Sequence, residues 1–278
     1  MSLPEDLRDS IEVPDDVRDE LARQAVRLGP IARRVYWLTR TSSTNDAVAA
    51  LAQAGAEEGI VVVAETQTAG RGRQGRSWFS PAGAGLYVSL LVRPGLADAA
   101  HENRSTLITL AAGVAVASAI RAATGLPAAI KWPNDVVIER RKLAGILVEA
   151  VNYGETRGFV VLGVGVNLQQ AAFPVELASR ATSIEAEIGR PADRAQVLGE
   201  VLASLAEAYA DLVAGRFDAI LSAWRRLASP TWSSVIEWDT PSGVRRGQVE
   251  DIDRTGALIV RVGDRLERLI AGEVRFGS

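Results

Sequence analysis

The stretch Gly70-Arg71-Gly72-Arg73-Gln74-Gly75-Arg76-Ser77-Trp78 decides which fold this sequence encodes. Its three glycines match, by letter, the G-x-G-x-x-G pattern of dinucleotide-binding domains. That pattern has its meaning only where a strand precedes it and a helix begins directly after it. The apolar run Ile60–Ala64 supplies the strand, so the interpretation depends on the residues that come after Gly75.

The residues after Gly75 do not favour a helix. Pro81, Gly83 and Gly85 interrupt the segment, and both residue types are poor in a helix interior. The next regular element, residues 86–92, has the apolar pattern of a second strand. We therefore predict a strand, a glycine-rich loop and a second strand, and we do not expect a dinucleotide-binding domain. The G-x-x-x-x-G-K-[ST] signature of P-loop phosphoryl transfer does not occur in the sequence either.

Arginines stand between the glycines of this loop. Guanidinium groups bind phosphates and carboxylates through paired hydrogen bonds, and Arg71, Arg73 and Arg76 supply three of them. Trp78 adds an aromatic face that can stack on a purine. The composition therefore favours a loop that closes around an anion carrying an aromatic group, such as an adenylate. A solvated basic hairpin on the surface is the alternative.

The composition limits the chemistry that the chain can perform. The 278 residues include no cysteine, so disulfides and thiolate catalysis are excluded. His101 is the one histidine, and its polar surroundings before a predicted helix are typical of a solvated loop residue. Serine–histidine catalysis and a zinc site are therefore not expected. Lys, Arg, Asp, Asn and backbone amides must carry the chemistry.

The overall charge and hydropathy exclude several classes of partner. The formal net charge of −3 gives no general attraction for nucleic acid. No uninterrupted apolar run approaches the ~20 residues of a membrane-spanning helix, and residues 1–6 lack the basic and apolar regions of a secretion signal. We expect a cytoplasmic protein with no membrane or nucleic-acid partner.

The pattern along the chain divides it into three parts. Residues 1–35 form an acidic extension with three prolines, in which one short helix is predicted at 15–28 and disorder is the alternative. Residues 36–229 alternate strands and helices, which indicates an α/β domain. Residues 230–278 contain short strands and tight turns, which predicts a small β-barrel. In the middle part we predict helices at 105–124, 194–214 and 217–228, and strands at 60–64, 86–92, 129–138, 143–151 and 158–166.

Four further segments place polar groups beside helix or strand ends. Ser43-Thr44-Asn45 precedes a helical run, and Lys131-Trp132-Pro133-Asn134-Asp135 interrupts a strand with a proline. Lys142 opens the next strand, and Gly163-Val164-Gly165-Val166-Asn167 ends another with two glycines and an amide. Each has a purely structural alternative, namely helix capping, a polar edge strand or a solvated strand end. In the last segment, Gly163 and Gly165 allow either a ligand or another element to approach the backbone closely.

Together with the arginine-rich stretch, these segments resemble the bacterial biotin protein ligase family, in the family's order and over residues 36–278. The resemblance implies a mixed sheet flanked by helices, related to class II aminoacyl-tRNA synthetases, and a C-terminal SH3-like domain. It implies that biotin and Mg-ATP give biotinyl-5′-AMP, and that a lysine of a biotin carboxyl carrier protein, such as that of acetyl-CoA carboxylase, then accepts the biotinyl group. Exposed strands in this fold can also pair into a homodimer.

The resemblance also implies roles for individual residues. The residues expected to bind biotin are Ser43, Thr44, Asn45, Gln67, Arg71, Gly72, Arg73 and Lys142. The residues expected to bind ATP or the adenylate are Gly70, Arg73, Trp78, Lys131, Asn134, Asp135 and Asn167. Arg73, Lys131 and Lys142 are the expected catalytic residues, and Asp135 is a candidate either to hold Mg²⁺ or to orient the acceptor amine.

Two other functions stay open. A lipoate or octanoate ligase has the same fold, although the arginine-rich stretch is a signature of the biotin family. A biotin-sensing regulator would need a DNA-binding module, and residues 1–35 are too short and too acidic for the winged helix-turn-helix of bifunctional members. We therefore expect a monofunctional ligase.

Overall fold

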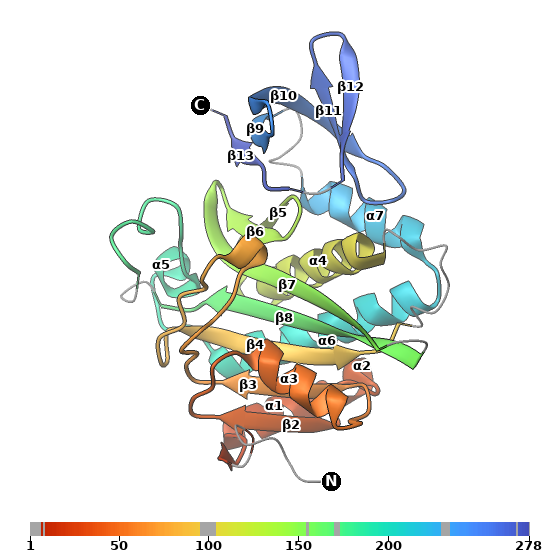
Figure 1. Ribbon diagram of the computed structural model, residues 1–278. Coiled ribbons are helices and arrows are strands. Elements are labelled where there is room, and N and C mark those ends of the chain that lie inside the picture. Colours follow the sequence, from red (N-terminus) through yellow and green to blue (C-terminus); the bar gives the residue numbers. More distant parts are fainter. Residues whose placement is uncertain are drawn as a thin grey trace.

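The structure, a computed structural model, describes residues 7, 9–94, 104–153, 156–169, 173–228, 234–270 and 272–277. Its larger part is built on one sheet (Figure 1). The eight strands are β1 (Ser10–Ile11), β2 (Arg34–Leu38), β3 (Ile60–Ala64), β4 (Gly85–Val92), β5 (Ala129–Lys131), β6 (Asp135–Ile138), β7 (Arg141–Tyr153) and β8 (Thr156–Asn167). Their order is β1-β2-β3-β4-β8-β7-β6-β5. Only β2 and β3 pair in parallel, so the sheet is mixed, as predicted.

Helices cover both faces of this sheet, and alternate side chains of β3 enter two cores. Val61 and Val63 enter the larger core, which includes side chains from most of the described helices (Figure 1). These helices are α1 (Asp15–Arg23), α2 (Ala25–Leu28), α4 (Arg104–Thr124), α5 (Ile184–Ile188), α6 (Arg194–Val213) and α7 (Phe217–Leu227). Val62 enters the smaller core, under α3 (Thr44–Gln53). On this second face of the sheet, the part beyond α3 is therefore not covered by a described helix.

Helix α4 is long and apolar enough to cross a membrane by length and composition. However, 61% of its most apolar window is buried inside the protein. It packs against α6, α7 and β7. This burial is typical of the core helix of an α/β domain.

The C-terminal part is a separate antiparallel sheet, as predicted. Its strands are β9 (Val235–Thr240), β10 (Gly243–Ile252), β11 (Leu258–Val262), β12 (Arg265–Leu269) and β13 (Arg275–Phe276), in the order β12-β11-β10-β9-β13. It lies over α7 and over the end of the large sheet that carries β5 (Figure 1). The indole Nε1 of Trp132 donates to the carbonyl of Gly256 at 3.1 Å, which ties the two parts together.

The N-terminal residues that the structure describes pack on the larger part. The predicted helix at residues 15–28 is present as α1 and α2, and β1 extends the sheet beside β2. The guanidinium of Arg27 binds Glu200 and Glu207 of α6. The division of the chain at residue 35 stays a prediction.

The prediction of one strand over residues 129–138 was wrong. Lys131 and Asp135 pair across an antiparallel hairpin formed by β5 and β6, and the Trp132–Pro133 peptide bond in its turn is cis. Proline cannot donate a ladder hydrogen bond, so the chain reverses there instead of continuing. β5 is the edge strand, as the proline predicted.

Among the described strands and α-helices, β1, β2 and the short helix α5 (Ile184–Ile188) were not predicted. The other predicted strands and helices of the middle part are present within a few residues of their predicted bounds. His101 and the predicted break at residues 229–230 lie outside the described residues.

Candidate active site

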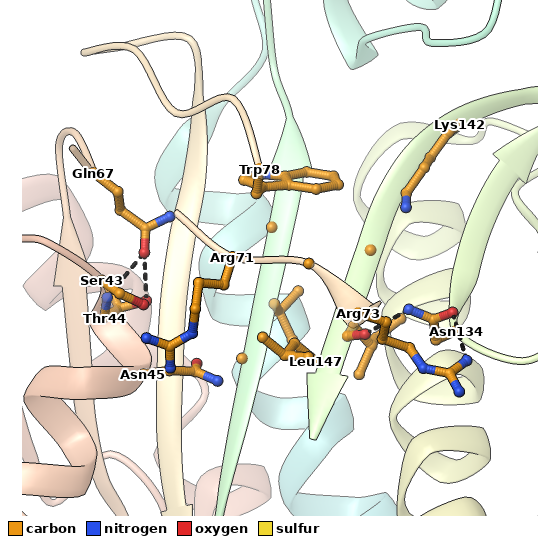
Figure 2. Close-up of a pocket in the computed structure, with 16 residues that line it drawn as sticks. Ser43, Thr44, Asn45, Gln67, Arg71, Arg73, Trp78, Asn134, Lys142 and Leu147 are labelled. Atoms are coloured by element: carbon orange, nitrogen blue, oxygen red, sulfur yellow. Dashed lines mark hydrogen bonds between the residues drawn. The ribbon is translucent and has the colours of Figure 1, made fainter. Parts of the chain in front are cut away.

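A cleft of about 470 Å³ lies on the α3 face of the sheet, beneath the loop that joins β3 to β4 (Figure 2). Its walls come from the start of α3, the loop, the β5–β6 hairpin, β7 and β8. The lining residues are Ser43, Thr44, Asn45, Gln67, Arg71, Gly72, Arg73, Trp78, Asn134, Lys142, Gly145, Ile146, Leu147, Gly163, Val164 and Gly165. Most of them belong to the segments that sequence analysis selected.

Residues 70–78, called the arginine loop below, form a small hairpin over this cleft. The N–H of Gly72 donates to the carbonyl of Arg76 at 2.7 Å, and the N–H of Trp78 donates to the carbonyl of Gly70 at 2.8 Å. Gln74 turns the tip with a φ of 58°. β4 then runs antiparallel to β3. The predicted strand–loop–strand arrangement is therefore confirmed, and a dinucleotide-binding domain is excluded.

A buried network of neutral hydrogen bonds forms one end of the cleft. Gln67 Oε1 accepts from the backbone N–H of Thr44 at 2.9 Å and from its hydroxyl at 3.2 Å, and Gln67 Nε2 donates to Ser80 Oγ at 2.9 Å. The hydroxyl of Ser89 lies 2.7 Å from Thr44 Oγ1 and 2.6 Å from Asn45 Oδ1. These contacts fix the polar groups of this end without a ligand.

Asn45 lies against the backbone of β8, and two carboxylates close the network around it. A Cβ added to Gly163 would lie 2.2 Å from Asn45 Oδ1, so glycine at this position lets the Asn45 amide approach the strand. Asn45 Nδ2 donates to Glu149 Oε2 at 2.6 Å. Arg71 donates to Glu149 at 2.9 Å and to Asp46 at 2.5 Å. The hydrogen bond to Asp46 raises the pKa of the Arg71 guanidinium, and the bond to Glu149 acts in the same direction against partial burial.

Trp78 lies flat on the sheet further along the cleft. Gly145 of β7 and Gly165 of β8 are paired in register. A Cβ on Gly165 would lie 2.5 Å from Trp78 Cε2, and one on Gly145 would lie 2.9 Å from Trp78 Cζ3. The ammonium of Lys142 is 5.1 Å from the Trp78 ring centroid. Two glycines therefore create the platform that the indole covers.

Both lysines of the chain meet at one carboxylate. Lys131 and Lys142 are the two lysines in the sequence, and Asp135 Oδ1 lies 2.6 Å from Lys142 Nζ while its Oδ2 lies 3.6 Å from Lys131 Nζ. The β5–β6 hairpin brings Lys131 opposite Asp135, and β7 brings in Lys142. One buried carboxylate therefore holds two ammonium groups at the other end of the cleft.

Arg73 adds a third cation to this end. Its Nη1 lies 3.3 Å from Asn134 Oδ1 and 3.4 Å from the carbonyl of Gly272, which are both neutral acceptors. Burial lowers the pKa of the Arg73 guanidinium, although the carboxylates of Asp135 and Glu273 act in the opposite direction. Arginine keeps its proton at neutral pH despite such shifts.

A second cleft of about 520 Å³ adjoins the first on the side of the C-terminal sheet. Trp78, Asp135, Lys142 and Glu273 are among its lining residues. An ion pair between Arg76 and Glu273 joins the arginine loop to the C-terminal part. A molecule that reaches the Lys142 end could therefore approach through this second cleft.

Four predicted site residues lie outside the walls of the first cleft. A Cβ on Gly70 would lie 2.6 Å from the carbonyl oxygen of Trp78, so Gly70 permits close packing inside the loop. Asn167 donates to the carbonyls of Lys142 and Thr182 at 3.3 and 3.0 Å, which ties the end of β8 to its neighbours. The remaining two are Lys131 and Asp135, of which Asp135 lines the second cleft.

Several residues that support the cleft were not predicted from the sequence. Asp46, Ser89 and Glu149 were not selected, yet each binds a selected residue. A signal for Glu149 exists, because Gly145, Leu147 and Glu149 alternate along β7 and so share one face. The alternation identifies the face but not the residue across it.

Among the described residues, no group of three or more His, Cys, Asp or Glu side chains could hold a metal ion. The predicted candidate for this role, Asp135, is already paired with two ammonium groups. The described residues therefore do not form a Mg²⁺ site of their own.

Comparisons with known proteins agree with this arrangement. The Biotin/lipoate A/B protein ligase family matches residues 37–167, and the Biotin protein ligase C terminal domain matches residues 239–277. The biotin--[acetyl-CoA-carboxylase] ligase of Mycobacterium tuberculosis is 37% identical over 274 residues, covering 96% of this chain and 97% of that protein. The bifunctional ligase/repressor BirA of Bacillus subtilis is 31% identical over 269 residues, covering 96% of this chain and 81% of that protein. The structure of a biotin protein ligase from Aquifex aeolicus in complex with biotin and ATP has a TM-score of 0.76 and 26% identity, covering 88% of this chain and 100% of that one.

Proposed function

Because this chain belongs to the biotin protein ligase family, we propose that it activates biotin with ATP as biotinyl-5′-AMP. It then transfers the biotinyl group to a lysine of a biotin carboxyl carrier protein, such as that of acetyl-CoA carboxylase. The observation that carries this proposal is one cleft with a neutral hydrogen-bonding end and a cationic end.

The neutral end suits the ureido ring of biotin. That ring presents N–H donors and a carbonyl acceptor, and Ser43, Thr44, Asn45 and Gln67 supply matching groups. Ser43 holds the position before α3 without making a side-chain capping bond, so its hydroxyl remains available for a ligand. Because the network around Thr44 and Asn45 is buried, a wrongly shaped ligand would leave polar groups unpaired.

The cationic end suits the first chemical step. The carboxylate oxygen of biotin attacks the α-phosphorus of ATP, and the bond to the β-phosphate oxygen breaks to release pyrophosphate. The two reactants are both anions, so the step needs positive charge in fixed positions. Lys142 and Arg73 supply this positive charge from the cleft wall. Lys131 shares the Asp135 carboxylate with Lys142 and so adds positive charge beside it. Trp78 offers its exposed face to the adenine.

We propose that Mg²⁺ arrives bound to the phosphates of ATP, because no group of three or more His, Cys, Asp or Glu side chains among the described residues could hold it. Mg²⁺ commonly keeps several waters and binds through substrate phosphates with few protein ligands. When bound it would neutralise phosphate charge. Asp135 then has the second of its two predicted roles, which is to attract and orient the acceptor amine.

In the second step the amine of the carrier lysine attacks the carbonyl carbon of biotinyl-5′-AMP. The bond to the phosphate oxygen breaks, AMP leaves and the amine loses a proton. The second cleft reaches Lys142 and Asp135 from the side of the C-terminal sheet, and we propose that the lysine side chain of the carrier enters through it. We place the reaction in the cytoplasm. β1 is an edge strand among the described strands, and we propose this edge as a surface through which two copies could pair.

The test is transfer of biotin to a purified carrier domain by the wild-type protein and by Lys142→Ala. Removing one donor that stabilises developing negative charge costs about 100- to 1,000-fold in rate, and we expect a loss of that size in single-turnover formation of biotinyl-5′-AMP. The matched control is Arg141→Ala, because Arg141 is the next residue, has similar side-chain exposure (39% against 35%) and pairs with Glu187 away from the cleft.

Two outcomes would contradict the proposal. Lys142→Ala could form the adenylate at the wild-type rate, which would remove Lys142 from the reaction. Alternatively, the wild-type protein could form lipoyl-AMP or octanoyl-AMP in preference to biotinyl-AMP, which would select the lipoate-type alternative. A DNA shift assay with biotin and ATP tests the regulator alternative, which specific nanomolar binding would support.

A further inference from the structure

The two arginines that flank Gly72 have different partners. Arg71 and Arg73 point toward opposite ends of the cleft (Figure 2). The guanidinium of Arg71 binds two carboxylates, Asp46 and Glu149. Among the described residues no carboxylate forms an ion pair with Arg73, whose partners are the neutral oxygens of Asn134 and Gly272. The charge of Arg71 is therefore neutralised by the protein, whereas the charge of Arg73 is available for a ligand.

Glu149 connects two parts of the site that are otherwise separate. Its Oε2 accepts from Arg71 Nη2 at 2.9 Å and from Asn45 Nδ2 at 2.6 Å. Arg71 belongs to the arginine loop, whereas Asn45 is fixed in the first turn of α3 by Ser89 and by the backbone of Gly163. The same carboxylate thus holds the loop down and orients a buried amide of the cleft.

We propose that Glu149 is a positioning residue that, together with Asp46, holds Arg71 so that the arginine loop stays closed over the occupied cleft. Arg71 is then an anchor of the loop, and Arg73 is the arginine that meets the anion. This rests on the proposed function, because the ligand retained beneath the loop is biotinyl-5′-AMP. The latch formed by Asp46, Arg71 and Glu149 lies at the neutral end of the cleft, beside Asn45.

The test measures how long the enzyme keeps its adenylate. Wild-type protein and Glu149→Gln are loaded with biotin and radiolabelled ATP, and release of biotinyl-5′-AMP is followed after a chase with excess unlabelled biotin. Because hydrogen bonds to charged groups are worth more than neutral ones while exposed ion pairs are weak, we expect release to be about 10-fold faster in the variant. The biotin KM should rise by a similar factor, with a much smaller change in kcat.

The matched control is Glu250→Gln in the C-terminal sheet. Glu250 has the same side-chain exposure as Glu149 (36%) and likewise pairs with one arginine. Its partner, however, is Arg261 of the C-terminal sheet and not a residue of the arginine loop. The control should retain the adenylate as the wild type does. Thermal unfolding of both variants shows whether removing a carboxylate has changed the stability of the fold.

Arg71→Gln and the double variant with Glu149→Gln keep the proposal testable if one variant folds poorly. The latch requires that Arg71→Gln also speeds release and that the two substitutions together add little to either one alone. If Arg71 were instead an anion ligand, Glu149→Gln would free its guanidinium and slow the release, which would overturn the proposal. Unchanged release in Glu149→Gln would also overturn it. A wild-type protein that forms no adenylate would contradict the proposed function itself.

Discussion

The two ends of the cleft are built by different means. The end at α3 is a network of hydrogen bonds among the neutral side chains of Thr44, Asn45, Gln67 and Ser89. The end at Lys142 carries three cations near the carboxylate of Asp135, and one of them, Arg73, also contacts the carbonyl of Gly272 in the C-terminal part. The protein itself holds the groups of the first end in place, whereas the second end has positive charge that an anionic ligand would balance.

This contrast explains how one cleft can serve a neutral ring and a polyanion. Neutral groups held in fixed positions discriminate by shape, because a poor fit leaves them unpaired. Cations held around a single carboxylate discriminate by charge and strengthen as the negative charge of the transition state develops. Strand β8 carries one glycine for each end, Gly163 under Asn45 and Gly165 under Trp78. These glycines offer the most direct way to separate the two ends.

Alanine at either glycine should affect one substrate and spare the other. The Cβ of Gly163→Ala would lie 2.2 Å from Asn45 Oδ1, so Asn45 must move and the biotin KM should rise by about 100-fold, the cost of an ångström-scale misplacement. The Cβ of Gly165→Ala would lie 2.5 Å from the Trp78 ring, so the ATP KM should rise instead. Steady-state release of pyrophosphate at varied biotin and ATP measures both constants.

Gly113→Ala in α4 is the control, since its Cβ would meet Ile130 at 3.7 Å, an ordinary contact distance. It should leave both constants unchanged. If Gly163→Ala and Gly165→Ala raised the same constant, the division of the cleft into two ends would be wrong.

Arg73→Gly should break the charged end while leaving the neutral end intact. Loss of the guanidinium removes one of the cations that face the anion, so we expect release of biotinyl-5′-AMP to be about 10-fold faster, the value of one charged hydrogen bond. The released adenylate should label bystander lysines in a mixture of carrier and unrelated protein. Labelling of the unrelated protein, detected with streptavidin, measures the leak.

A gain of loop flexibility could produce the same leak, and Gln74→Gly separates the two causes. Gln74 already has a φ of 58°, which glycine adopts without strain, and its side chain is not part of the first cleft. Gln74→Gly should therefore retain the adenylate. An equal leak in both variants would show that the conformation of the loop, and not the charge of Arg73, retains the ligand.

Local chemistry made much of the fold predictable. Pro81 and the glycines after it excluded a helix, and the observed antiparallel pair of β3 and β4 confirms the strand–loop–strand prediction. The hairpin at Pro133 was not predicted, because a proline in an apolar run is equally consistent with a bulge, an edge strand or a reversal. Which of these occurs depends on the pairing of β6 with β7, a contact distant from the proline.

The candidate site was predictable where segments carry distinctive residues and unpredictable where residues act through partners. Lys142 and Trp78 were selected from the sequence, and both line the cleft. Glu149 resembles any polar residue at the end of a strand, and it becomes informative only when the loop brings Arg71 within 2.9 Å. Asn167 was selected for its position after two glycines, but the structure uses its amide to join strand ends.

The smallest effect is expected where the arginine loop meets the C-terminal sheet. Arg76 pairs with Glu273, but 62% of the Arg76 side chain is exposed, and exposed ion pairs contribute little after the entropy of ordering long side chains. Arg76→Gln should therefore raise the ATP KM by no more than about threefold at low salt. The effect should vanish near physiological ionic strength, where the Debye length falls to about 8 Å. The loop retains a second contact with the C-terminal part through Arg73 and Gly272, and that contact does not depend on Arg76.

Glu273→Gln should give the same small change, and the double variant should add nothing to it. A loss in Arg76→Gln larger than that in Arg73→Gly, or one that persists at high salt, would mean that docking of the C-terminal sheet determines nucleotide binding. The charged end of the cleft would then be a property of the interface between the two parts, rather than of the lysines and Arg73.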